Sequence, residues 1–137
     1  MSALEDTIAK ELCTTLLAFG ASHAHIAKVV YTLFQHTIKS TVENGVFVTY
    51  QWIDDSWIRV PHNDLLLNPI RSKLAPYFNK AHCHIVYPKT NDPQYHTKCN
   101  QWQKKSLEIM TIQESLYNHT FMKCILDEAI LLFYKPE

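Results

Sequence analysis

The sequence has very little glycine: Gly20 and Gly45 are the only two in 137 residues. Loops that cradle nucleotide phosphates need several glycines at fixed offsets, because only glycine lets the backbone come close to the phosphates. Neither the G-x-x-x-x-G-K-[ST] pattern nor the G-x-G-x-x-G pattern can be written in this chain. Phosphate-binding loops of these two kinds are therefore excluded, and we expect no cofactor in this segment.

Paired cysteines and long apolar runs are also missing. Cys13, Cys83, Cys99 and Cys124 are far apart and form no C-x-x-C pair, so a disulfide framework is not expected. No apolar run approaches about eighteen residues, the length that argues for a membrane span. The first twenty residues lack the basic start of a signal peptide. We therefore expect an intracellular protein with reduced thiols and no membrane association.

Enough apolar residues are present to build a core, since 47% of the chain is hydrophobic. Apolar stripes at spacings of three and four predict five helices, and the length fits a single domain over residues 1–137. The helices are expected over residues 4–19, 22–38, 64–79, 101–117 and 119–134. Residues 80–98 are expected to be an irregular loop, with a short strand from Cys83 to Tyr87.

A β-hairpin is predicted over residues 46–60. Two runs rich in β-branched and aromatic residues flank Asp54, Asp55 and Ser56, whose side chains can bond their own backbone in a turn. An isolated hairpin is marginally stable in water, so it must pack on helices. The fold class is therefore α+β, a mostly helical single domain with one hairpin.

Turn-forming residues and prolines set the expected boundaries of the helices and strands. Residues 41–45 form the turn that feeds the hairpin. Pro69 is placed in the first turn of its helix, where its missing N–H costs little. Pro76 is expected to end or bend that helix about two turns later.

The zero net charge hides an uneven distribution. Residues 56–105 hold eight basic and two acidic residues, a net charge of +6. Residues 1–55 and 106–137 each carry a net charge of −3. A basic centre between acidic ends predicts a polarised surface, although ordinary solvated faces would explain the same counts.

Nucleic-acid contact is the first hypothesis for the basic centre. Lysine and arginine hold phosphates, and exposed aromatic rings stack on bases. The candidate contact residues are Arg59, Arg71, Lys73, Lys98, Trp102, Lys104 and Lys105. The competing interpretation places at least two of Trp52, Trp57 and Trp102 in the core.

A zinc site is the second hypothesis. Cys83, His84, His96 and Cys99 flank the proline-containing loop and offer the thiolate and imidazole ligands that zinc prefers. Alternatively, Cys83 is a small core residue and the histidines are exposed. No possible nucleophile lies in a sequence context typical of hydrolases. The adjacent carboxylates, Asp54–Asp55 and Asp127–Glu128, are expected to point apart. This segment is therefore not expected to be an enzyme.

The order of elements resembles a known family. The segments that carry the resemblance are HIAKVVYTLFQHTIKS, VFVTYQWIDDSWIRV, LLLNPIRSKLAPYF and SLYNHTFMKCILDEAILLFYKPE. They are similar to the domain that precedes the superfamily 3 helicase motor in poxvirus-type primase-helicases. The final helix fits closely at Asn118, Phe121, Ile125, Leu126, Glu128, Leu132 and Phe133. The helix–hairpin–helix order is also similar to winged-helix modules.

The resemblance implies a non-catalytic module of a viral-type DNA replication primase-helicase. Such a module would link primase to motor, help a ring assemble and guide DNA. Its partners would be single-stranded or duplex DNA, the helicase and primase domains of the same polypeptide, and other copies of itself. Its location would be the host cytoplasm or nucleus. A docking module without DNA contact and a small zinc-bearing regulator are the alternatives.

Overall fold

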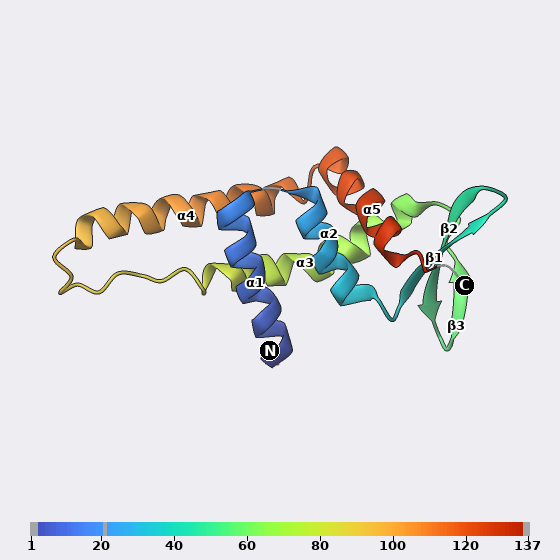
Figure 1. Ribbon diagram of the computed structural model, residues 1–137, viewed down its shortest axis with the longest axis horizontal. Helices are drawn as coiled ribbons and strands as arrows, with labels where there is room; N and C mark the ends of the chain where they lie inside the picture. Colours follow the sequence, from blue (N-terminus) through green and yellow to red (C-terminus); the bar gives the residue numbers. More distant parts are fainter. Residues whose placement is uncertain (1–2, 21, 136–137) are drawn as a thin grey trace.

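The computed structural model describes residues 3–20 and 22–135, which form helices in the middle and a sheet at one end (Figure 1). The elements are α1 (Ala3–Phe19), α2 (His23–Phe34), β1 (Ile38–Glu43), β2 (Val46–Ile53), β3 (Ser56–Arg59), the 3-10 turn η1 (Asn63–Leu66), α3 (Leu67–His82), α4 (Tyr95–Ser115) and α5 (His119–Phe133). The predicted mostly helical α+β domain is confirmed. Within the described residues, no helix is both long and apolar enough to cross a membrane.

The core is shared by all five helices. Apolar residues at helical spacing place Leu12, Ile26, Leu74, Ile109 and Ile125 at 2% exposure or less. α1 packs on α3, and α2 packs on α5. Some apolar residues of the predicted helices are solvent-exposed instead, including Leu4, Phe19, Leu107 and Leu132.

The sheet has three antiparallel strands in the order β1-β2-β3, so the prediction of a single hairpin is incomplete. The predicted hairpin is β2–β3, with Ile53 paired to Ser56 across a two-residue turn at Asp54 and Asp55. Both turn residues have positive φ, as a type I′ turn requires. Ser56 lies in the strand and not in the turn.

The first hairpin, β1–β2, replaces the predicted end of a helix. α2 ends at Phe34 and not near residue 38, and residues 38–43 form β1. Asn44 and Gly45 have φ of 54° and 78° and connect the strands as a second two-residue turn. Asn-Gly is the favoured pair for this geometry because both central residues need positive φ.

α5 attaches the sheet to the helices. The Asn118 side chain accepts a 3.0 Å hydrogen bond from the Phe121 amide, which caps the helix. At the other end of α5, the Ser40 hydroxyl donates to the Ile130 carbonyl at 2.6 Å. Ser40 also forms a parallel bridge with Tyr134, which covers the outer edge of β1.

α3 runs further than predicted. Pro69 lies in the first turn, as expected, but the helix passes through Pro76 and ends at His82. Tyr77, Phe78 and Ala81, which follow that proline, are buried. Core packing therefore outweighs the hydrogen bond that the proline removes.

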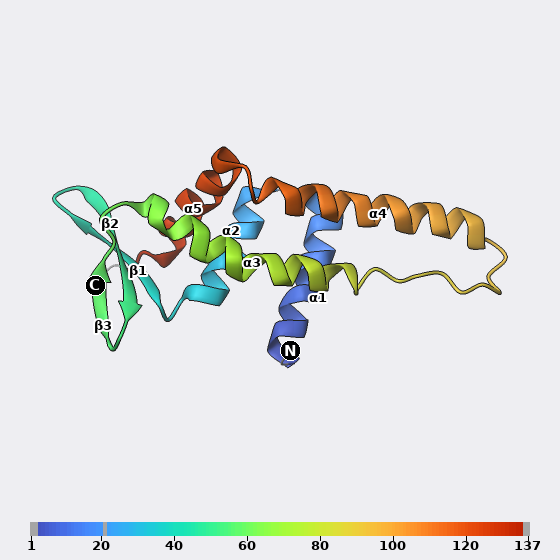
Figure 2. The same ribbon diagram turned by 180° about the vertical axis from the view of Figure 1, so that it is seen from behind.

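α4 begins at Tyr95, six residues before the predicted start. The irregular segment is therefore limited to residues 83–94, and residues 83–87 form no strand. The segment runs beside the first half of α4 and projects with it beyond the helical body (Figures 1 and 2). We call residues 83–106 the arm.

The two type I′ turns should respond oppositely to substitution. No atom lies within 4 Å of a Cβ added at Gly45, so Gly45→Ala costs only the positive φ, about 1 kcal/mol of unfolding free energy. Asp55→Gly removes a side chain at φ 65° and should leave stability unchanged or higher. Urea denaturation measures both values. Equal losses in the two variants would contradict the turn assignment.

Candidate nucleic-acid interface

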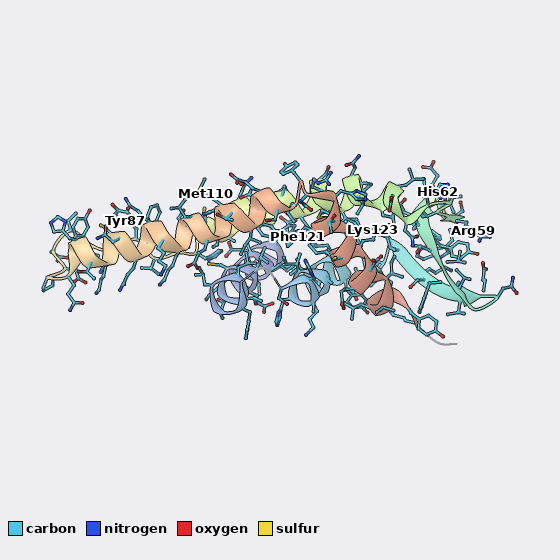
Figure 3. The ribbon with its side chains drawn as sticks, turned by 90° about the horizontal axis from the view of Figure 1, so that it is seen from above. Arg59, His62, Tyr87, Met110, Phe121 and Lys123 are labelled. Atoms are coloured by element: carbon cyan, nitrogen blue, oxygen red, sulfur yellow. The ribbon has the colours of Figure 1, made fainter. Side chains whose placement is uncertain are left out.

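The seven predicted contact residues do not form one patch. Arg59 lies at the sheet end of the molecule, and Tyr87, on the arm, lies at the opposite end (Figure 3). Arg71 and Lys73 lie between them on α3. Lys98, Trp102, Lys104 and Lys105 are on the half of α4 that belongs to the arm.

Three of the predicted residues meet on the arm. Lys98, Trp102 and Lys105 lie on α4 at intervals of four and three residues, so they share one helix face. That face lines one side of a pocket of about 370 Å³, and the irregular segment, residues 83–94, lines the other side. The pocket is lined by Val86, Tyr87, Pro88, Lys89, Asp92, Lys98, Gln101, Trp102 and Lys105.

Tyr87 fixes the irregular segment against α4. Its ring meets that of Trp102 edge to face, with centroids 5.1 Å apart. Its hydroxyl lies 3.3 Å from the Tyr95 hydroxyl, and the Cys99 thiol donates to it at 3.9 Å. The hydrogen bond with Tyr87 raises the pKa of Tyr95 above its usual value.

The pocket carries excess positive charge. Lys89, Lys98 and Lys105 face a single carboxylate, that of Asp92. Asp92 accepts hydrogen bonds from Lys98 Nζ at 2.5 Å and from the Gln94 amide at 2.8 Å. These bonds lower the pKa of Asp92, with the Lys98 bond contributing most. Asp92 therefore organises the turn into α4 and pairs with Lys98, whereas Lys89 and Lys105 form no ion pair with the residues that the structure describes.

Arg71 is used inside the protein. Its Nε donates to the Leu116 carbonyl at 2.6 Å, and its Nη1 donates to the Asn68 side chain at 2.7 Å. Leu116 is the residue after α4, where backbone carbonyls lack helical partners. The Arg71 guanidinium also lies 5.4 Å from the centre of the Tyr117 ring. Arg71 therefore ties α3 to the end of α4.

The remaining basic residues differ in surroundings. Lys73 Nζ lies 5.5 Å from the centre of the Phe34 ring. Arg59 is 4.0 Å from a Glu43 oxygen, and its side chain is 64% exposed. Lys104 is exposed and makes no hydrogen bond or ion pair with the residues that the structure describes. It does not line the arm pocket.

None of the three tryptophans is fully buried, so the placement of two of them in the core is wrong. Trp52 is 41% exposed, and Trp57 and Trp102 are half-buried. Trp102 packs partly against the core and partly against Tyr87.

The four zinc candidates are not brought together. His84 Nε2 lies 3.2 Å from a carboxylate oxygen of Asp6 on α1, and Cys83 is exposed beside it. His96 and Cys99 lie on α4, where they contact Tyr95 and Tyr87 respectively. Throughout residues 3–20 and 22–135, no three histidine, cysteine, aspartate or glutamate side chains gather as metal ligands would.

Tyr87 and Lys89 are the aromatic and the basic residue of the arm pocket that were not among the predicted contact residues. Lys89 and Tyr87 precede Pro93 in a segment without periodicity, so no pattern indicated which way they face. The signal that could have drawn attention to them is the local balance of charge. Residues 83–106 contain four lysines, one aspartate and no glutamate.

Comparison with models of known protein families gave no match, and neither did comparison with curated proteins. Any function of the chain must therefore be inferred from its residues and their arrangement.

Replacing Arg71 should affect stability and not anion binding. Arg71→Lys keeps the charge but loses the Nε donor to Leu116, so the unfolding free energy should fall by about 1–2 kcal/mol. Lys73→Ala, an exposed change on the same helix, is the control and should alter it by less than about 0.5 kcal/mol. Urea denaturation measures both. An unfolding midpoint for Arg71→Lys equal to that of the unaltered chain would overturn this role.

Proposed function

We propose that this chain is a non-catalytic nucleic-acid-binding module of a DNA replication protein, and that the arm holds the phosphate backbone. The observation that carries the proposal is the pocket in which Lys89, Lys98 and Lys105 surround Tyr87 and Trp102. Lysines supply the charge that neutralises phosphates, and the rings supply surfaces on which bases stack.

The mechanism is electrostatic. Lysines that neutralise phosphates release condensed counterions, which drives binding and makes it fall with salt. The projection of the arm beyond the helical body favours this, because a strand can approach it from several sides (Figure 1). Asp92 gives the opposite charge at only one point of the pocket.

The family resemblance supports a place within a larger replication assembly. The α5 helix that matches best begins at its Asn118 cap and leaves Leu131 and Leu132 exposed at 56% and 38%. Exposed leucines on a helix whose opposite face is buried in the core are suited to packing on a neighbouring domain. The proposed module would thus link primase and motor domains, aid self-assembly and guide DNA.

A docking module without DNA contact is the second candidate. The observation that favours it is the exposure of Leu4 and Phe19, at 68% and 67%, at the two ends of α1. A stable oligomer whose size does not respond to DNA, measured by light scattering, would favour docking over DNA guidance.

Lys105 and Lys104 provide a matched test of the arm. Both are exposed neighbours on α4, but only Lys105 lines the pocket. Lys105→Ala should weaken binding of a fluorescent single strand and reduce the slope of log affinity against log salt by about 0.7, the value for one lost phosphate contact. Lys104→Ala should reduce it less. Fluorescence anisotropy at a series of salt concentrations measures both slopes.

Two controls accompany this measurement. Circular dichroism should show the same helical content in both variants, because neither lysine is buried. A fluorescent duplex tested in parallel reports strand preference. If Lys105→Ala binds both the single strand and the duplex with an unchanged slope of log affinity against log salt, the pocket is removed from the proposal.

A further inference from the structure

A second cluster of aromatic and charged residues covers one face of the sheet. The pairing register sets Lys39, Tyr50 and Arg59 side by side across the three strands. Trp52 and Trp57 are paired two residues further along β2 and β3, so they point to the same face. This sheet-face cluster lies at the opposite end of the molecule from the arm (Figures 1 and 3).

Contacts within the cluster hold the rings in position. The Trp52 and Trp57 rings meet edge to face with centroids 5.3 Å apart. Lys39 Nζ lies 4.4 Å from the centre of the Trp57 ring and 5.6 Å from that of Tyr50. The Tyr50 hydroxyl donates to Glu43 at 2.8 Å. Such contacts lower the entropic cost of binding, because the rings are ordered before a ligand arrives.

The cluster borders a pocket of about 560 Å³. This pocket is lined by the Tyr31, Tyr50 and Trp57 rings, by Lys39, and by Lys135 beyond the end of α5. Among the described residues, Glu43 is the one carboxylate in its lining. Arg59 adds a further positive charge at the edge of the cluster, so the face complements an anionic ligand that presents flat rings.

We propose that the sheet-face cluster binds single-stranded nucleic acid, with bases stacked on Trp52 and Trp57 and phosphates held by Lys39 and Arg59. Unpaired bases can present their faces to aromatic side chains, whereas bases inside a duplex stack on one another. The inference rests on the proposed function in that the chain binds nucleic acid. It adds a second site and a preference for single strands.

A proline-rich peptide is the other ligand that aromatic grooves take. It is uncharged along its backbone and makes no use of Lys39, Arg59 and Lys135. Lys39, Arg59 and Lys135 lie on the Glu43 side of the cluster, away from the turn carboxylates Asp54 and Asp55, and these three positive charges favour the polyanion.

The test uses tryptophan fluorescence in a Trp102→Phe background, which leaves Trp52 and Trp57 as the only tryptophans. Thymidine oligonucleotide, an abasic oligonucleotide of equal length, duplex DNA and decaproline are titrated at low salt. Thymidine oligonucleotide should quench the emission, while the abasic strand and the duplex should quench it weakly. Equal quenching by the abasic strand, no quenching by thymidine oligonucleotide, or quenching by decaproline alone would overturn the proposal.

Variants then assign the site. Trp52→Ala should weaken binding of thymidine oligonucleotide by roughly five- to a hundredfold, as for base–aromatic stacking removed by alanine substitution, and Trp52→Phe should restore most of it. Trp52 is 41% exposed, so its loss should leave the fold intact, which circular dichroism checks. An unchanged affinity ratio of single strand to duplex in Trp52→Ala would contradict the site.

The two proposed sites can fail separately. If Lys105→Ala leaves the salt slope unchanged while thymidine oligonucleotide still quenches Trp52 and Trp57, the arm fails and the sheet face stands. If Lys105→Ala lowers the slope but no base-dependent quenching occurs, the sheet face fails and the arm stands.

Discussion

The packing of α3 is the constraint on which the rest of the structure depends. Ile70, Leu74, Phe78 and Ala81 lie along one face of this helix and are fully buried. They place α3 against α1, α4 and α5, so one helix contacts most of the body. Burial of a large apolar side chain contributes about 1.5–3 kcal/mol, enough for the helix to persist through Pro76. Because α3 also leads from the sheet to the arm, it keeps the two candidate surfaces at opposite ends (Figure 1).

The spacing of apolar residues predicted the helices that bury a continuous apolar stripe. It failed where tertiary contacts determine the secondary structure. α1 and α5 were predicted to within a few residues because their apolar positions repeat over the whole helix. The first six residues of α4, YHTKCN, have no such repeat, and Tyr87 contacts two of them, Tyr95 and Cys99. β1 was missed although Asn44-Gly45 is a strong hairpin signal, because the helix that ends at Phe34 was extended to residue 38 and residues 41–45 were assigned to a turn.

The candidate site was predicted in part, because the sequence shows which residues are charged but not which way their side chains point. Lys98, Trp102 and Lys105 were predicted from charge and residue type, and only the earlier start of α4, at Tyr95, puts Lys98 on the same helix face as the other two. Arg71 has the same charge, yet an unpartnered carbonyl at the end of α4 lies within reach of its guanidinium. That partner comes from a residue 45 positions away, so no local pattern could reveal it. The aromatic sheet face was not predicted, because residues 38–43 were not recognised as a strand and Lys39 was therefore not placed beside Tyr50.

The zero net charge of the chain does not oppose binding of a polyanion, because the charges are separated in space. Along α4, Lys98 is ten residues from Glu108, about 15 Å at the rise of an α-helix. This exceeds the Debye length of about 8 Å at physiological ionic strength, so Glu108 is largely screened from Lys98. A strand approaching the arm would therefore meet the local excess of lysine and not the average of the molecule. Projection of the arm thus lets a neutral protein present a basic surface.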